Sequence, residues 1–197
     1  KNDKKFSKYT NESTTKIFYG HKKNVTKRVL ECAKYYKLDI VCLVTGDCPL
    51  IDYRQINDLL TEFISRKKID YINNGSHGLP NGMACQIFTV KALEKSYKLI
   101  KKKDEYEHVT LCMRRNNKIF KNLLFKTSKN LNLPNLAVTL DEKKDFILIK
   151  NIILYFLKKK NLFFSCKEMI KFLEDNKTMR LINSDVKRND NKIKLSY

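Results

Sequence analysis

Apolar positions recur with two different spacings along the chain. Residues 24–36 and 53–66 place apolar side chains three or four positions apart, which predicts two amphipathic helices. Residues 39–45 (DIVCLVT) form an almost continuous apolar run, which predicts a central parallel strand buried on both faces. With short strands at residues 16–19 and 70–72, the order is β-α-β-α-β. This alternation predicts an α/β fold, a three-layer sandwich around a mostly parallel central sheet.

The second half of the chain carries the same mixture of elements after a loop at residues 73–82. The elements expected there are a strand at residues 85–90, helices at 91–103 and 105–115, a strand or hairpin arm at 119–126, a strand at 136–140, a helix at 142–157 and a helix from Ser165 to about residue 174. Ser165 and Glu168 have the spacing of a capping box. We therefore expect a flexible segment at 1–15, one folded domain at 16–183 and a frayed polar tail at 184–197.

The composition fits one domain with a substantial core and a basic surface. The 197 residues are 42% hydrophobic, which excludes a wholly disordered chain. The formal net charge of +20 favours anionic ligands, but 34 Lys stand against only 7 Arg. Arginine is the residue that forks onto bases and phosphates, and the lysines are spread in short runs. We therefore expect a solvated basic surface rather than a nucleic-acid-binding one.

The six cysteines indicate a reducing environment. They contain no CxxC pair, which argues against a zinc ribbon or a redox motif. Cys32, Cys42 and Cys112 lie in or beside apolar stretches and are expected in the core. A chain of this size does not need disulfides, so we expect a cytoplasmic protein. The apolar run at residues 146–157 is too short to span a bilayer, so no membrane insertion is expected.

The strongest candidate for chemistry is the segment TGDCPLID at residues 45–52. A buried strand would deliver Asp47 to the carboxyl edge of the sheet, where open α/β sheets bind ligands. Gly46 would let the backbone approach a ligand, and Asp47 could hold Mg²⁺ against phosphate oxygens. The alternative is structural, with Asp52 as the N-cap of the next helix and Asp47 closing a turn.

A second acid, Asp141, also follows a predicted strand and precedes a helix. It could be a simple N-cap, with Asp145 favoured by the dipole of the helix. If its strand lies near that of Asp47, the two carboxylates could share one Mg²⁺, since such a site needs only one or two acids. His108 is more typical of a structural hydrogen-bonding residue, and no P-loop or dinucleotide fingerprint is present.

Five blocks occur in a characteristic order: GDCPLID, DYINN, LPNGMACQIF, EYEHVT and LAVTLDEKKDF. Together they resemble the cytidylyltransferase family of the acylneuraminate and spore-coat polysaccharide kind, over residues 16–175. The resemblance implies a nucleotide-diphospho-sugar transferase (GT-A-like) fold and transfer of CMP from CTP to an acidic or surface-polysaccharide sugar. It also implies a homodimer, in which residues 118–132 could be an inserted hairpin arm.

The resemblance assigns roles to individual residues. Asp47 and Asp141 match the metal-associated, catalytic acids, and Gly46 stands with Asp47 on the nucleotide side. The residues that match the substrate side are Asn74, Pro80, Asn81, Gly82, Glu107 and His108.

The chain also departs from the family pattern. The family's first strand and its Gly- and Arg-rich loop have no counterpart, so we expect a fragment that lacks the first nucleotide-binding unit. Ala84 and Gln86 stand where the family has acids, and arginines of the family pattern are replaced at three further positions. The replacements include Leu43, Tyr106 and Ala137. Three alternatives stay open. The chain could belong to an enzyme, or it could be a non-catalytic relative that binds a sugar, a nucleotide or a protein. The third alternative is a basic nucleic-acid-binding domain, for which no motif matches.

Overall fold

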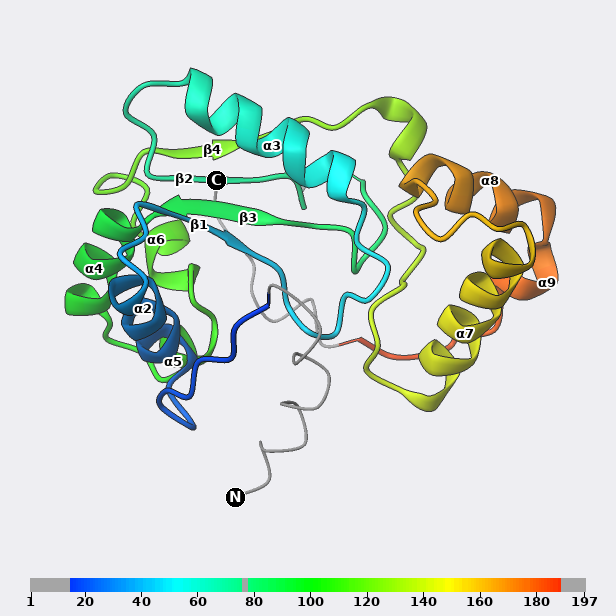
Figure 1. Cartoon of the computed structure of the whole chain (residues 1–197), viewed down its shortest axis with the longest axis horizontal. Helices are drawn as coiled ribbons and strands as arrows, with labels where there is room; N and C mark the ends of the chain where they lie inside the picture. Colours follow the sequence, from blue (N-terminus) through cyan, green and yellow to red (C-terminus); the bar gives the residue numbers. More distant parts are fainter. Residues whose placement is uncertain (1–14, 76–77, 189–197) are drawn as a thin grey trace.

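The computed structural model describes residues 15–75 and 78–188 (Figure 1). Within these ranges the strands form one sheet, in the order β1-β3-β2-β4. Their bounds are β1 Ile40–Leu43, β2 Tyr71–Asn73, β3 Gln86–Thr89 and β4 Asn122–Leu124. β3 pairs antiparallel with both β1 and β2, whereas β4 pairs parallel with β2. The fold is α/β, as predicted, with a mixed sheet.

The prediction of a mostly parallel sheet is wrong for the pairing of β3, which is antiparallel to both of its neighbours. β1, β2 and β4 run in one direction, and β3 lies between β1 and β2 in the opposite direction. Residues 74–75 and 78–85, the described part of the connection from β2 to β3, contain no crossover helix, and a return of this kind brings β3 back antiparallel. Within the described sheet β1 is therefore an edge strand. Its Cys42 is exposed, so the expectations of a strand buried on both faces and of Cys42 in the core are wrong.

Helices cover both faces of the sheet (Figure 1). On one face α3 (Tyr53–Ser65) packs Leu59 into a core with Ile72. On the other face the neighbouring Tyr71 packs among α2, α4 and α6, because successive side chains of a strand point to opposite faces. The helices of that side are α2 Val25–Tyr35, α4 Val90–Leu99, α5 Asp104–Glu107 and α6 Leu111–Arg115.

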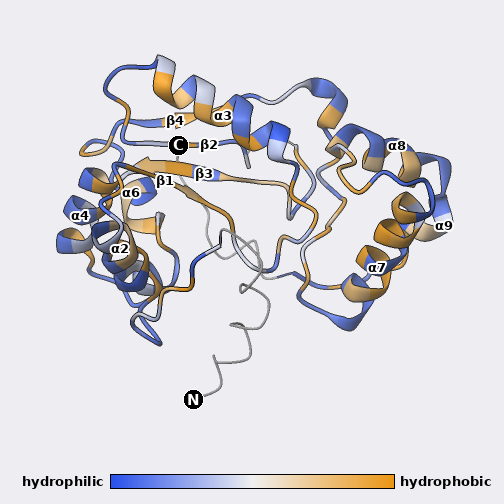
Figure 2. Ribbon diagram, viewed as in Figure 1, coloured by the Kyte–Doolittle hydropathy of each residue, from blue (hydrophilic) through white to orange (hydrophobic). Residues whose placement is uncertain are grey.

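A further group of helices, here called the helical lobe, lies beyond the carboxyl ends of β1 and β2 (Figure 1). It comprises η1 Lys129–Leu131, α7 Lys143–Lys158, α8 Cys166–Asp175 and α9 Lys177–Arg180. α7 and α8 share a core that includes Leu148 and Leu173, and Figure 2 shows α7 hydrophobic over much of its length. Leu50 and Met83 join this core from the loops at the edge of the sheet. Their burial attaches the helical lobe to the edge where the candidate acids lie.

Several local predictions are corrected. Residues 16–19 form no strand, and residues 136–140 contribute only an isolated bridge between Ala137 and Asn81. Residues 118–132 are not a hairpin arm, because their strand β4 pairs parallel with β2 while Leu131 enters the core of the helical lobe. The predicted helix at 142–157 and the capping box at Ser165 are confirmed.

Most of the predicted flexible start and part of the tail lie in residues 1–14 and 189–197, outside the described residues. Among the helices within the described ranges, none combines the length and apolar character that a bilayer crossing requires.

Candidate functional site

The loop after β1 presents the first candidate acid at the carboxyl edge of the sheet. Asp47 is exposed, and a turn closes beside it where the Cys48 amide donates to the Thr45 carbonyl. Gly46 is exposed, and a Cβ added to it would meet nothing within 4 Å. Asp52 is the N-cap of α3, as the structural reading predicted, and its carboxylate also accepts from the Cys166 amide of α8 at 2.8 Å. The end of the GDCPLID block therefore joins the sheet region to the helical lobe.

A single backbone hydrogen bond connects the two acid-bearing segments. The Leu140 amide donates to the Asp47 carbonyl at 2.8 Å, immediately before Asp141. Two residues earlier in the same segment, the Val138 amide donates to the Asn81 carbonyl at 2.7 Å. Residues 136–141 therefore contact both the Asp47 loop and the Pro80–Gly82 loop. The structure brings Asp47 and Asp141 to the same edge of the sheet, where the sequence predicted them to meet.

Gly82 makes this close approach possible. It has φ +96°, a conformation that side-chain-bearing residues rarely adopt. A Cβ at this position would lie 2.7 Å from the Thr139 amide nitrogen and 2.8 Å from the Val138 carbonyl carbon. Both contacts are with backbone, which cannot rotate away. The Pro80–Gly82 loop therefore supports the strand-like segment that leads to Asp141.

A buried carboxylate, Asp145, fixes the backbone at Asp141. The Asp145 side chain is 0% exposed and accepts from the amides of Asp141 and Glu142, at 3.1 and 2.9 Å. It also accepts from Asn183 at 2.7 Å and from Arg188 at 2.6 Å. Glu142, rather than Asp141, is the N-cap of α7, and Asp145 completes its capping box. Asp141 therefore does not cap the helix, and its side chain is 52% exposed.

Neighbouring groups shift the pKa values of Asp145 and Cys48. Burial raises the pKa of Asp145, but the hydrogen bonds from Arg188, Asn183 and the two amides outweigh it, so the pKa lies below its usual value. Burial also raises the pKa of the Cys48 thiol, and the negative charges of Asp47 and Asp141 add to this effect. Both carboxylates therefore lie near Cys48, which is a neutral thiol at neutral pH and a poor ligand for a hard cation.

The donor set at this edge fits a magnesium–nucleotide site. Asp47 and Asp141 offer two oxygen ligands, and Mg²⁺ in such sites commonly takes one or two carboxylates together with phosphate and water. In the described part of the chain, no group of three or more His, Cys, Asp or Glu side chains could hold a metal ion. Two carboxylates are a donor set that suits a cation which also binds phosphate and water.

The predicted substrate-side residues reach the same end of the sheet in different states. Asn74 follows β2 and is 0% exposed, with its side-chain oxygen accepting from the Cys85 amide at 2.8 Å. Its side-chain nitrogen is buried and has no hydrogen-bond partner among the described residues. Gln86, which replaces a family acid, accepts from the hydroxyl of Thr110 in the EYEHVT block. Glu107 and His108 of that block are exposed at the end of α5, and no hydrogen bond of theirs reaches Asp47 or Asp141 in the described structure.

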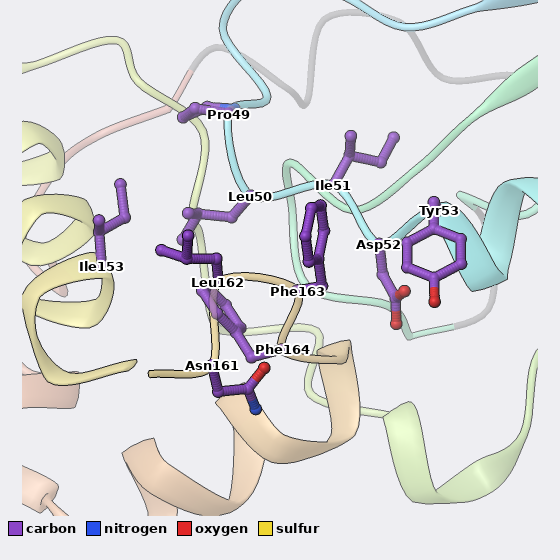
Figure 3. A pocket seen from close by; sticks show the side chains of 10 residues that line it. All are labelled: Pro49, Leu50, Ile51, Asp52, Tyr53, Ile153, Asn161, Leu162, Phe163 and Phe164. Atoms are coloured by element: carbon purple, nitrogen blue, oxygen red, sulfur yellow. The ribbon is translucent and has the colours of Figure 1, made fainter. Parts of the chain in front are cut away.

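A pocket of about 250 Å³ lies behind the Asp47 loop, between Pro49–Tyr53 and the connection from α7 to α8 (Figure 3). Ile51, Leu162 and Phe163 make its lining largely apolar, and neither Asp47 nor Asp141 lines it. Its one carboxylate, Asp52, is already occupied by Arg54 and the Cys166 amide. None of its lining residues is a Lys, Arg or His, so the pocket offers no cationic side chain to a nucleotide phosphate.

Sequence reasoning missed the contribution of the C-terminal segment. Residues 184–188, predicted to fray, lie against the start of α7, where Arg188 donates to Asp141 and Asp145. Asn183 is buried and donates to the Ala137 carbonyl at 2.9 Å as well as to Asp145. The signal available in the sequence was an Asn and an Arg in an otherwise unpatterned polar stretch, and only the fold pairs them with Asp145.

The chain is similar in sequence to two known proteins. No protein-family model matches the chain. The chain is 29% identical over 188 residues to the uncharacterized protein MJ1063 of Methanocaldococcus jannaschii, covering 95% of this chain and 75% of that protein. It is 24% identical over 141 residues to the spore coat polysaccharide biosynthesis protein SpsF of Bacillus subtilis, covering 68% of this chain and 55% of SpsF.

A solved structure is similar to the chain in fold. A cytidylyltransferase from Leptospira borgpetersenii matches with a TM-score of 0.83 and 27% identity, over 90% of this chain and 74% of that one. The structural match and SpsF confirm the resemblance to the cytidylyltransferase family that the order of the motifs predicted. The chain spans between about half and three quarters of the length of these relatives.

Proposed function

We propose that the chain forms the core of a cytidylyltransferase-type nucleotidyltransferase with a GT-A-like fold, which transfers CMP from CTP to an acidic or surface-polysaccharide sugar with Mg²⁺. The observation that carries the proposal is the Leu140–Asp47 hydrogen bond, because it holds Asp47 and Asp141 at one edge of the sheet. The likeness to the Leptospira cytidylyltransferase and to SpsF supports the reaction class.

In the proposed reaction a sugar hydroxyl oxygen forms a bond to the α-phosphorus of CTP. The bond between the α-phosphorus and its bridging oxygen to the β-phosphate breaks, pyrophosphate leaves, and the hydroxyl proton is released to water. Asp47 and Asp141 hold the cation, and a bound Mg²⁺ supplies positive charge to the phosphate oxygens. The exposed side of the Asp47 loop, with open space at Gly46, leaves room for the nucleotide.

The direct test is pyrophosphate release from CTP with candidate sugar acids, with and without Mg²⁺. Asp47→Asn should lower the rate at least about 100-fold, which corresponds to about 2.7 kcal/mol in the barrier. Asp58→Asn, an exposed substitution on α3 away from the edge, is the matched control and should keep the parent rate. An Asp47→Asn protein as active as the control would remove the metal role from Asp47.

A second candidate is a non-catalytic relative that binds a nucleotide or sugar. It is favoured by one observation: Gln86, at a position where the family has an acid, is neutral and holds Thr110 instead. Calorimetric binding of CTP or CMP-sugar without any pyrophosphate release, across a panel of sugar acids, is the result that this candidate predicts.

A further inference from the structure

Arg188 bridges the candidate metal acid Asp141 and the buried Asp145. Its Nη2 donates to Asp145 Oδ1 at 2.6 Å, and its Nη1 lies 3.4 Å from Asp145 Oδ2. The same Nη1 donates to Asp141 Oδ2 at 3.2 Å. The Arg188 side chain is only 15% exposed, and its one guanidinium serves a structural carboxylate and a candidate catalytic one at once.

The two halves of this bridge differ in strength. Asp145 is fully buried, so separating it from Arg188 would leave an uncompensated charge in the interior. The Asp141 side chain is half exposed and meets the guanidinium through one longer hydrogen bond, and exposed ion pairs contribute little. The Arg188–Asp145 contact is thus the anchor, and the Arg188–Asp141 contact is the one that can open.

A divalent cation and a guanidinium repel each other when they share one carboxylate. We propose that Arg188 is an internal counter-ion of Asp141, from which a divalent cation displaces it while it stays anchored on Asp145. This inference rests on the proposed metal role of Asp47 and Asp141. Arg188 is a positioning residue in this scheme, since it acts through Asp141.

The exchange has a consequence for the form in which the cation binds. The fixed positive charge of Arg188 opposes a bare divalent cation at Asp141. The same charge is offset when the cation arrives with the negative phosphates of a nucleotide. The site therefore favours the metal–nucleotide complex over the free metal ion.

The test is a titration with Mn²⁺, as a spectroscopic substitute for Mg²⁺, alone and together with CTP. Arg188→Gln should bind free Mn²⁺ roughly three- to tenfold more tightly than the parent, because one positive charge near the site is gone. The gain should be smaller for Mn²⁺ with CTP. Lys187→Gln, which removes one charge from the exposed neighbouring position, is the matched control and should stay within about twofold of the parent.

A second variant, Arg188→Lys, is a control for loss of folding. Arg188→Lys keeps a positive charge beside Asp145 and should keep near-parent affinity for free Mn²⁺. Equal Mn²⁺ affinity in Arg188→Gln and Lys187→Gln, or weaker binding in Arg188→Gln, would overturn the exchange. If neither the parent nor Arg188→Gln binds Mn²⁺ even with CTP, both the exchange and the proposed metal site fail. Tighter Mn²⁺ binding by Arg188→Gln in a protein without CTP turnover supports the exchange and counts only against the proposed function.

Discussion

The two acid-bearing segments reach the same edge of the sheet by different means. Asp47 sits on an exposed turn after the edge strand β1, held by local backbone bonds and by one bond from Leu140. Asp141 precedes α7 and is supported from behind by Asp145, which collects donors from both α7's start and the C-terminal segment. The position of the first acid therefore depends on backbone hydrogen bonds, within its own turn and from Leu140. The position of the second depends on contacts between residues about 40 positions apart.

This difference predicts that the two segments respond differently to substitution. A change at Asp47 should remove activity and leave the fold intact, because the side chain is exposed and the hydrogen bond described for it is a long one, from the adjacent Cys48 thiol at 3.6 Å. A change behind Asp141 should lower stability and activity together. The predictions below test that contrast, beginning with the largest expected effect.

Removing the charge of Asp145 should produce the largest loss of stability. Asp145→Asn leaves Arg188 without its buried partner, and breaking a buried pair in this way typically costs about 3–5 kcal/mol. The free energy of unfolding from urea denaturation is the measurement. Asp185→Asn is the control, since Asp185 pairs with Lys144 on the surface of the same segment and should leave the midpoint nearly unchanged. Equal midpoints for the two variants would show that the Asp145 network does not support the fold.

Substituting Gly82 should give the next largest effect. Gly82→Ala places a methyl group against the backbone of Val138 and Thr139 at a φ that alanine disfavours, at a cost of about 2 kcal/mol. The displaced segment carries Asp141, so pyrophosphate release should fall as well. For stability, Gly46→Ala is the matched control, because its added Cβ meets nothing within 4 Å. A Gly82→Ala protein with parent stability would contradict the close packing of the two loops.

The stability of the protein at acid pH should depend on Asp145, which supports the Asp141 segment. The folded-state pKa of Asp145 lies below its usual value, which is about 3.9 in an unfolded chain. Its contribution is therefore present above about pH 4 and is lost as the pH falls through the lower folded value. Denaturation midpoints from pH 7 to pH 3 should fall less steeply in Asp145→Asn than in the parent. A residual slope is expected in both, because backbone and Arg115 hydrogen bonds outweigh burial and lower the pKa of Glu105 as well.

The sequence predicted those features whose cause is local. The spacing of apolar residues located α3 and α7, and the Ser165 and Asp52 caps were recognisable because a cap is a contact between near neighbours. The strand direction of β3 was not predictable in the same way. Nothing in residues 85–90 distinguishes a parallel from an antiparallel strand, and the direction follows from the direct connection to β2.

In the candidate site, too, some residues were predictable from the sequence and others were not. That Asp47 and Asp141 end two segments was visible in the sequence, and the structure places those segments side by side through Leu140. Arg188 and Asn183 were invisible as site residues, because their partners lie 38 to 47 positions away and a polar stretch carries no periodicity. Charge counting also failed there. It gave 34 Lys and 7 Arg and could not show that one of these arginines reaches Asp141.

The smallest predicted effect tests a local support of the helical lobe. Ser165 caps α8 by accepting from the Glu168 amide, while Glu168 accepts from the Ser165 amide. Ser165→Ala should lower the free energy of unfolding by about 1 kcal/mol, the usual loss for an N-cap. CTP turnover should stay at the parent value, because the capping box makes no contact with the network behind Asp141. Ser184→Ala, in the segment that leads to Arg188, is the comparison, since its hydroxyl contacts only the nearby Leu181 carbonyl. A fall in turnover with Ser165→Ala, larger than with Ser184→Ala, would mean that the position of Asp141 depends on the whole helical lobe rather than on Asp145 and its donors.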